Sequence, residues 1–265
     1  MVGAAEAWVT TPEWMDFLRP DSPAHRHKLL ERELYLRLWA PHVRPGCRVL
    51  DIGGGIGRFS MWCLDLGCDV HLVDADAISL EVARGHAQGR PGTLTTYHTT
   101  AEELPPVQAD VVIAAELLCY VHDAGAVLAG LRPRLVPGGA LLFSVEARWG
   151  WGMALDAPAG HLGALLEDGV LHIPGDRYVR TFDEVDVRAL FQGWALPTLE
   201  RSHYVLSGPL QQLAGDVDAD ALFAWEDRLR GHSVLGQLNR AWIGVAHAGP
   251  PTESQTGRAA GERGS

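Results

Sequence analysis

The sequence predicts an α/β fold built on a doubly wound, mostly parallel sheet, and three observations lead to this prediction. Between residues 47 and 146, short apolar runs alternate with segments of helical periodicity. The first two apolar runs each end on an acid, Asp51 and Asp74. Directly after the first run, four glycines stand within five positions, at Gly53, Gly54, Gly55 and Gly57. Strands that alternate with helices pair in parallel through right-handed crossovers, which produces an open sheet.

A helix is expected before this alternating region, because leucines recur at helical spacing from residue 24 and Pro41 ends the run. Within the region, apolar and β-branched runs predict strands, and a 3.6-residue period predicts helices. The strands expected are 47–52, 69–74, 93–99, 109–116 and 137–146, and the helices expected are 57–66, 77–88 and 123–135.

The regularity weakens after Glu146. Residues 147–181 are rich in glycine and aromatic residues, which indicates an inserted lid over the ligand edge of the sheet. The rest predicts a helix, a strand, a helical segment and a last strand, at 183–193, 197–206, 218–240 and 241–248. The expected division is therefore an N-terminal helical cap at 1–45, a main domain at 46–248 with insertions at 147–181 and 207–240, and a disordered tail at 249–265.

Composition narrows the class of partner. The formal charge of the 265-residue chain is -11, and Lys28 is its only lysine, so a nucleic acid partner is not expected. The first thirty residues have no apolar core of a signal peptide, and no long apolar run predicts a membrane span. The spacing of the four cysteines matches no zinc site and no redox motif, which favours free thiols and a cytoplasmic location. The protein is expected to be a monomer or a homodimer.

The glycine cluster needs an explanation beyond a tight turn, because glycine loses the most conformational freedom on folding. A backbone that a ligand must approach closely provides one. The dinucleotide fingerprint G-x-G-x-x-G requires a third small residue, but the positions counted from Gly53 and Gly55 hold Arg58 and Ser60. A nicotinamide-dependent oxidoreductase is therefore the less favoured alternative.

The form apolar-apolar-acid-apolar-G-x-G-x-G resembles the class I S-adenosylmethionine (SAM)-dependent methyltransferase family, from Arg48 to Glu146. The resemblance implies a seven-stranded Rossmann-like sheet, with 46–248 as the methyltransferase domain. It also implies that Asp51 supports the loop and the amino group of SAM, and that Gly53, Gly55 and Gly57 pass under the methionine moiety. Asp74 would bind both ribose hydroxyls, a role that suits the paired acceptors of a carboxylate.

The segment "HTTAEELPP" resembles the adenine loop of the same family. Ala101 matches the family pattern, whereas Thr100 stands where an acid is usual, so either Thr100 or Glu102 takes the adenine amino group, or backbone groups suffice. Ala75, directly after Asp74, completes the expected cofactor contacts. The family's fourth-strand motif corresponds to residues 109–123, which puts Glu116 between the methionine moiety and the acceptor.

Methyl transfer from a sulfonium depends mainly on positioning, and a general base is needed only if the nucleophile arrives protonated. The expected catalytic candidates are Glu116, Tyr120 and His122, of which His122 has the pKa range suited to a base. Indole faces attract cations, so tryptophans near the lid are candidates for substrate binding. The substrate-binding residues expected are Trp14, Tyr35, Trp149, Trp151 and Tyr178.

The residues after the fourth strand read "ELLC", without the Asn/Asp-Pro-Pro-aromatic tetrad of enzymes that methylate adenine or glutamine nitrogens. No acidic cluster points to Mg²⁺, and no Pro-Cys nucleophile is present. A small-molecule acceptor, preferably a natural-product intermediate, is therefore expected, with N-methylation favoured over O-methylation because the chain is acidic. A SAM-binding protein without transferase activity, which acts through a partner, remains the other alternative.

Overall fold

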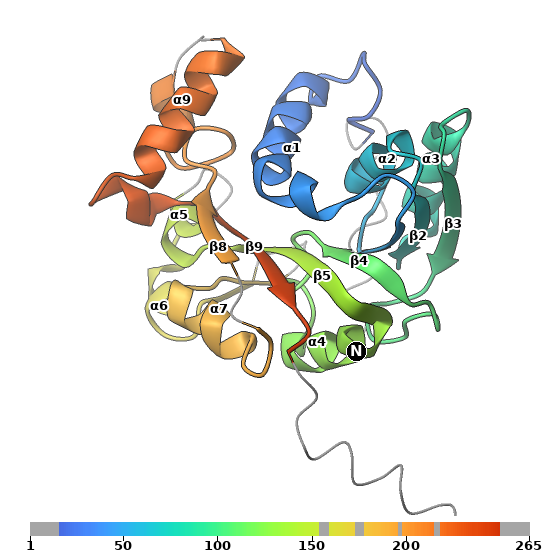
Figure 1. Cartoon of the computed structure of the whole chain (residues 1–265). Helices are drawn as coiled ribbons and strands as arrows, with labels where there is room; N and C mark the ends of the chain where they lie inside the picture. Colours follow the sequence, from blue (N-terminus) through green and yellow to red (C-terminus); the bar gives the residue numbers. More distant parts are fainter. Residues whose placement is uncertain (1–15, 154–158, 173–177, 196–197, 215–217, 250–265) are drawn as a thin grey trace, which may run out of the picture.

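The structure is a computed structural model that describes residues 16–153, 159–172, 178–195, 198–214 and 218–249. Its centre is a seven-stranded sheet in the order β3-β2-β1-β4-β5-β9-β8 (Figure 1). Only β9 runs antiparallel to its neighbours, β5 and β8, so the mostly parallel sheet expected from the sequence is confirmed. The strands are β1 (Arg48–Ile52), β2 (Asp69–Asp74), β3 (Thr93–His98), β4 (Ala109–Ala114), β5 (Leu135–Glu146), β8 (Thr198–Ser202) and β9 (Ala241–His247).

Helices cover both faces of the sheet because neighbouring strand residues point to opposite faces. Val49 of β1 packs with the first helices and Leu50 packs with the later ones. The first face carries α1 (His25–Trp39), α2 (Arg58–Asp65) and α3 (Ala77–Ala87), and the second carries α4 (Ala124–Leu131), α5 (Arg148–Gly152), α6 (Leu162–Leu166) and α7 (Glu184–Leu190). The two further helices are α8 (Gln211–Ala214) and α9 (Ala219–Arg230).

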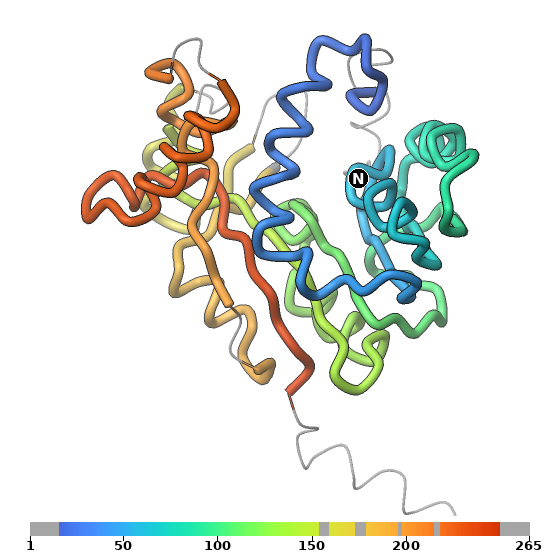
Figure 2. The backbone as a smooth tube through the Cα atoms, turned by 45° about the horizontal axis from the view of Figure 1, so that its top comes forward, coloured from blue at the N-terminus to red at the C-terminus, as the bar shows by residue number. Residues whose placement is uncertain are grey.

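Helix α1 lies over the antiparallel end of the sheet, as the tube in Figure 2 shows. Trp39, at its last turn, is 0% exposed, and its indole N–H donates to the carbonyl of Gly244 in β9 at 3.2 Å. A side chain at Gly244 would collide with the Phe143 ring, so glycine permits this close packing. The N-terminal helix is thus fixed to the last strand of the chain.

The segment 147–181 forms α5, α6 and a hairpin of β6 (Val170–His172) and β7 (Tyr178–Arg180). Trp151 and Leu171 are buried in the core of the second face. The backbone N–H of Arg180 donates to the carbonyl of Cys119 at 2.8 Å. The insertion therefore contacts the segment that follows β4, while its role as a lid stays a prediction.

The strand expected over 197–206 ends at Ser202. His203 has a φ of 64°, which turns the chain out of the sheet. The next three backbone N–H groups bond to Glu226 of α9, whose Oε1 accepts from Tyr204, Val205 and Leu206 at 2.9 to 3.0 Å. The apolar run "YVL" is buried, but a side chain rather than a neighbouring strand satisfies its backbone.

The four cysteines are free and buried, in agreement with the sequence prediction. Among the described residues, no helix combines the length and the apolar character needed to cross a membrane.

Replacing the buried carboxylate of Glu226 tests this description of the turn. Glu226→Ala leaves three backbone donors without their acceptor, and we expect a loss of about 3 kcal/mol or more in the free energy of unfolding, measured by urea denaturation. Asp227→Asn is the matched control, because Asp227 lies beside it, is exposed, and pairs with Arg37 at the surface. This exposed pair is expected to contribute no more than about 1 kcal/mol. Equal losses in the two variants would contradict the description.

Candidate functional site

The glycine loop connects β1 to α2, and its glycines have different physical reasons. A Cβ on Gly54 would lie 2.5 Å from Leu72 Cδ1, so packing alone requires glycine there. Gly57 precedes α2 with a φ of 90°, and Gly53 has a φ of 66°. Gly55 has a φ of 55° and would place its Cβ in open space. Backbone conformation and free space coincide at Gly55, as expected where a ligand approaches the chain.

Asp51 lies beneath this loop and is 0% exposed. Its Oδ2 accepts a hydrogen bond from Ser60 Oγ at 2.6 Å, whereas its buried Oδ1 has no hydrogen-bond partner among the described residues. Burial raises the pKa of Asp51 to about 6, against the lowering effect of the Ser60 hydrogen bond. The free oxygen is an acceptor suited to an N–H donor, such as an amino group in the loop.

Asp74 ends β2 and holds the loop from the side. Its Oδ2 accepts from the backbone N–H of Gly55 at 2.7 Å, and its Oδ1 accepts from that of Asp76 at 2.8 Å. Burial raises the pKa of Asp74, and these backbone hydrogen bonds oppose the rise. Each carboxylate oxygen accepts more than one hydrogen bond, so both retain capacity for a further donor.

The loop after β3 lies next to Asp74. The backbone N–H of Thr99 donates to the carbonyl of Asp74 at 3.1 Å, and a ring nitrogen of His98 is 3.0 Å from the carbonyl of Ala75. In this loop Ala101 is buried, whereas Thr100 and Glu102 are exposed. These residues expected to contact a cofactor therefore lie along one edge of the sheet, at the carboxyl ends of β1, β2 and β3.

Glu116 follows β4 at the same edge. Its φ is 56°, an uncommon value for a residue other than glycine. Its carboxylate accepts from Tyr35 Oη at 2.7 Å and pairs with Arg58 at 2.9 Å. Burial raises the pKa of Glu116, but the charges of Arg58 and Lys28 and the hydrogen bond from Arg58 together lower the pKa to about 2. The structure thus brings together two residues that the sequence analysis selected separately, Glu116 and Tyr35.

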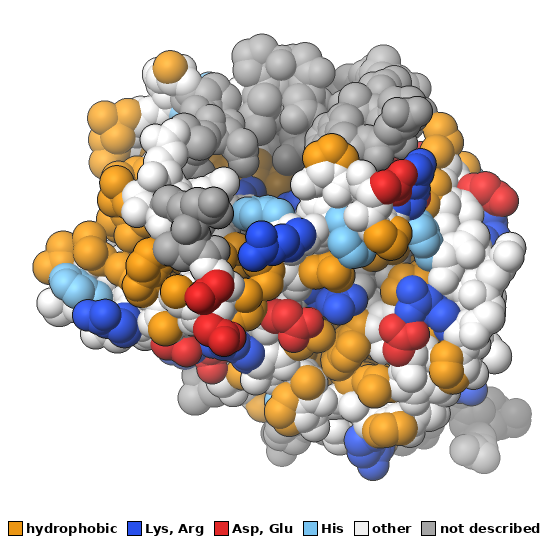
Figure 3. Space-filling model, turned by 90° about the horizontal axis from the view of Figure 1, so that it is seen from above, with side chains coloured by type: hydrophobic (Ala, Val, Ile, Leu, Met, Phe, Trp, Pro, Cys, Tyr) orange, Lys and Arg blue, Asp and Glu red, His pale blue; other side chains and the backbone are white. Residues whose placement is uncertain are grey.

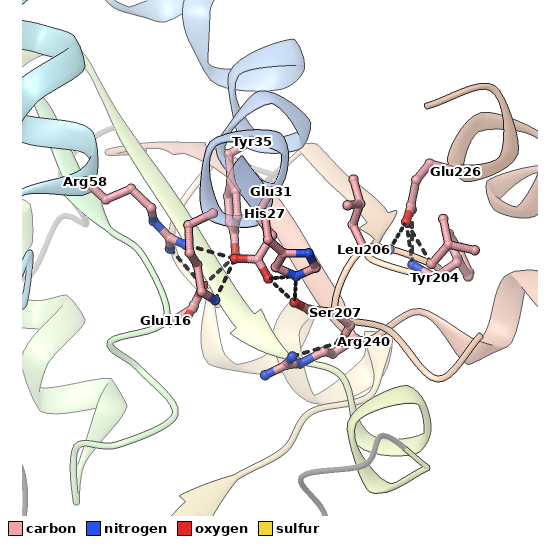
Figure 4. Close-up of polar contacts among 12 residues, drawn as sticks. His27, Glu31, Tyr35, Arg58, Glu116, Tyr204, Leu206, Ser207, Glu226 and Arg240 are labelled. Carbon is pink, nitrogen blue, oxygen red and sulfur yellow. Dashed lines mark hydrogen bonds and ion pairs between the residues drawn. The ribbon is translucent and has the colours of Figure 1, made fainter. Parts of the chain in front are cut away.

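Arg58 is the first residue of α2 and joins the glycine loop to α1. It is 2.9 Å from Glu116 and 3.6 Å from Glu31, and its guanidinium lies over the Tyr35 ring at 5.2 Å. Figure 4 shows these side chains converging from α1, α2 and the segment after β4. Three elements that are distant in sequence therefore meet at one charged cluster.

A small cavity of about 20 Å³ adjoins this cluster. Its wall combines carboxylates, cations and one imidazole, and includes Tyr35, Glu116, Glu146, His203 and Arg240. Among the described residues, three other than glycine have positive φ, namely Glu116, His203 and Ser207. Glu116 and His203 line this cavity, and Ser207 donates a hydrogen bond to Glu31 in its wall. Strained backbone of this kind tends to gather at functional sites.

The other residues selected from the sequence lie elsewhere. Tyr120 is half-buried against the core of the second face, and His122 is exposed directly before α4. Trp149 is 40% exposed on α5, whereas Trp151 is 1% exposed and packs in the core, which gives it a packing role. Tyr178 begins β7, but its side chain lies outside the described part, as does the whole of Trp14.

A larger hollow of about 340 Å³ lies between β8, β9, α7 and α9. Ion pairs line it, including Arg230 with Glu200 at 3.1 Å and Arg201 with Glu184 at 3.3 Å. None of its residues belongs to the glycine-loop edge. The small cavity, not the larger hollow, therefore adjoins the candidate site.

Four residues of this site were not predicted from the sequence: Glu31, Arg58, His203 and Arg240. One signal was available for Glu31, because His27, Glu31 and Tyr35 are spaced four residues apart and so share one face of α1. Arg58 had been considered only as a departure from the dinucleotide fingerprint. No sequence pattern marks His203 or Arg240 as site residues, because they reach the cavity only through the turn after β8.

Comparison with known proteins gives a domain match. Residues 50–141 match a family model described as "Methyltransferase domain". A protein of Cereibacter sphaeroides named ubiquinone biosynthesis O-methyltransferase is 39% identical over 113 residues, which are 42% of this chain and 46% of that protein. The protein of the same name from Paramagnetospirillum magneticum is 33% identical over 140 residues, 49% and 56% of the two chains. The chain thus spans about half the length of the curated relatives it matches.

Solved structures are similar over more of the chain. An S-adenosylmethionine-dependent methyltransferase from Mesorhizobium loti aligns with a TM-score of 0.57 at 20% identity, covering 82% of this chain and 97% of that one. The Burkholderia thailandensis 1,6-didemethyltoxoflavin-N1-methyltransferase, with S-adenosylhomocysteine bound, aligns with a TM-score of 0.54 at 18% identity, covering 91% and 92%. At these identities the similarity shows the fold, and the Rossmann-like class is confirmed.

The packing reason given for Gly54 is testable. Gly54→Ala forces Leu72 or the Asp51 carboxylate to move, and we expect a loss of about 1 to 3 kcal/mol in the free energy of unfolding. Gly85→Ala is the control, because Gly85 lies in α3 with open space at its Cβ and should become more stable by up to about 1 kcal/mol. Chemical denaturation measures both, and an unchanged Gly54→Ala would remove the packing argument.

Proposed function

We propose that this chain, which carries a class I SAM-dependent methyltransferase domain, transfers the methyl group of SAM to a small-molecule acceptor. The domain match over residues 50–141, together with the shared fold, bears out the family resemblance found in the sequence. The observation that carries the proposal is that this matched segment contains the loop, Asp51, Asp74 and Glu116. These groups belong to the strand ends of one sheet edge, where open α/β sheets bind ligands.

The residues at that edge fit the parts of SAM. The free Oδ1 of Asp51 suits the amino group, and the open side of Gly55 admits the methionine moiety. The remaining acceptor capacity of Asp74 suits the two ribose hydroxyls. Ala75, Thr100, Ala101 and Glu102 are the proposed contacts of the adenine. When bound, SAM supplies a methyl group activated by the sulfonium.

The protein's own contribution is to hold the acceptor in line and exclude water, and positioning of this kind is worth about 7 to 11 kcal/mol. Glu116 is held at the cavity by Arg58 and Tyr35, and its low pKa keeps it ionised at pH 7. It therefore suits a positioning role better than that of a proton acceptor. Tyr120 and His122 stay predictions as participants in proton transfer.

The acidity of the chain favours an acceptor with an amine. At the cavity itself the charges balance, because Glu31, Glu116 and Glu146 pair with Lys28, Arg58 and Arg240. The formal charge of -11 therefore supports N-methylation ahead of O-methylation. On the face in Figure 3, basic and acidic side chains lie beside one another, which supports a small acceptor rather than a nucleic acid. A natural-product intermediate remains our preferred acceptor class.

Calorimetry and a product assay test the proposal. We expect the purified chain to bind SAM and S-adenosylhomocysteine, and to form the latter from SAM with at least one member of a panel of amines and phenols. If SAM does not bind, the proposal fails. If SAM binds and no acceptor yields S-adenosylhomocysteine, the result favours a SAM-binding protein that acts through a partner.

The role of Asp74 gives a sharper expectation. Asp74→Asn replaces one acceptor oxygen by a donor, so we expect the Kd for SAM to rise at least about tenfold, or about 1.4 kcal/mol, in calorimetry. Asp69→Asn is the matched control, because Asp69 begins the same strand at the opposite end and bonds to Arg48 and Thr93. The Kd of Asp69→Asn for SAM should stay close to that of the unmodified chain. Equal affinity in both variants would remove Asp74 from the binding site.

A further inference from the structure

The turn after β8 is held rigidly in an unfavourable conformation. His203 and Ser207 have φ values of 64° and 56°. Between them, Glu226 of α9, itself 0% exposed, accepts from three successive backbone N–H groups. The carbonyl of His203 accepts from the backbone N–H of Arg240 at 3.0 Å. Positive φ at residues other than glycine costs about 1 to 3 kcal/mol each and persists only where the surroundings impose it.

This turn presents His203 to the cavity. The side chain lines the cavity, is 3% exposed, and has its ring 5.0 Å from the Tyr35 ring. Its buried Nδ1 has no hydrogen-bond partner among the described residues. A buried polar atom left without a partner costs about 1 to 3 kcal/mol. Both the backbone and the ring of His203 are therefore held at a cost in stability.

The charged groups around His203 are paired with one another. Glu31 lies 2.7 Å from Lys28, Glu116 lies 2.9 Å from Arg58, and Glu146 lies 3.6 Å from Arg240. The charged groups of the cavity wall therefore have partners, whereas the Nδ1 of His203 has no hydrogen-bond partner among the described residues. Such an atom at a cavity suits a ligand that brings its own polar hydrogen.

The cavity size limits what that ligand presents. About 20 Å³ holds a single water-sized group, such as one hydroxyl or one amino group. The cavity also adjoins the glycine loop, because Glu116 pairs with Arg58 of α2 and a Cβ on Gly53 would lie 2.9 Å from Leu117. The group in the cavity thus lies next to the proposed cofactor edge.

We propose that His203 is a catalytic residue, whose Nδ1 accepts a hydrogen bond from the hydroxyl or amino group of the acceptor and takes its proton during methyl transfer. This inference rests on the proposed function and narrows the acceptor to one with a protic nucleophile. A lone pair on the acceptor oxygen or nitrogen forms a bond to the methyl carbon while the C–S bond breaks. The electron pair of that bond stays on sulfur, and the acceptor proton moves to Nδ1, which leaves a neutral thioether and an imidazolium.

The electrostatic surroundings suit this step. Burial and the charges of Arg240 and Arg58 lower the pKa of His203, against the carboxylates of Glu31 and Glu116, to about 4, so the ring is neutral at pH 7. A weak base suffices because the acceptor proton becomes strongly acidic as the new bond to carbon forms. The two carboxylates partly offset the cost of the imidazolium that results.

His203→Asn tests the proposal with little disturbance of the turn, because asparagine tolerates positive φ and keeps a polar side chain but does not titrate. With an acceptor that the unmodified chain methylates, we expect the kcat of His203→Asn to be lower by about 100-fold or more. The Kd of the variant for SAM should stay within about threefold of that of the unmodified chain. His247→Asn is the matched control, since His247 ends β9, at the edge of the sheet remote from the cavity, and should keep its kcat. An unchanged kcat in His203→Asn would overturn the proposal.

The pH profile of kcat separates a catalytic from a structural role. Nδ1 with a pKa of about 4 stays unprotonated down to about pH 5, so with saturating SAM and a phenolic acceptor, whose own pKa of about 10 lies outside this range, kcat of the unmodified chain should fall below pH 5. His203→Asn should lack the fall. A loss of rate in His203→Asn that leaves the acid limb in place would indicate a structural role and contradict the proposal.

A second measurement needs no turnover and no variant. With S-adenosylhomocysteine bound, the unmodified chain is titrated with phenol and with benzylamine while the imidazole ¹⁵N signals are recorded. We expect one of the probes to shift the Nδ1 signal of His203. If S-adenosylhomocysteine binds but neither probe moves that signal, the role of His203 is wrong and the proposed cofactor site stands. If S-adenosylhomocysteine does not bind, the proposed function itself fails.

Discussion

The ion pair between Arg58 and Glu116, at 2.9 Å, is the contact on which the arrangement of the site depends. Arg58 begins the helix that the glycine loop leads into, and Glu116 follows the strand next to β1. Glu31 and Tyr35 of α1 complete the same cluster. A single guanidinium therefore sets the relative positions of the loop, the segment after β4 and the N-terminal helix, which a planar group with several donors does well.

The first half of the site could be predicted because its determinants are local. The loop needs glycines at fixed positions after a strand, and Asp51 and Asp74 stand where two parallel strands end. Parallel strands place their carboxyl ends at one edge, so residues that follow different strands meet there. The alternation of strands and helices followed from local periodicity, whereas the number of seven strands was implied by the family resemblance.

The second half could not be predicted because it depends on contacts between distant segments. His203 reaches the cavity only because Glu226 replaces a strand partner for the turn that follows β8. Arg240 lies there because the last strand begins beside that turn. The apolar run after Ser202 reads as a continuing strand, and nothing local indicates that a buried carboxylate will satisfy its backbone instead. Packing between distant segments overrides local preference in such cases.

The two halves also differ in when they can form during synthesis. Every residue of the loop edge, from Asp51 to Glu116, has left the ribosome long before Arg240 does, and β1 finds its parallel neighbours β2 and β4 within that early portion. Helix α1 is made before these strands, yet Trp39 rests on β9, so its packing must wait until residues 241–247 have emerged. Nascent chains would accordingly gain the loop edge early, and complete the small cavity only once β9 has been made.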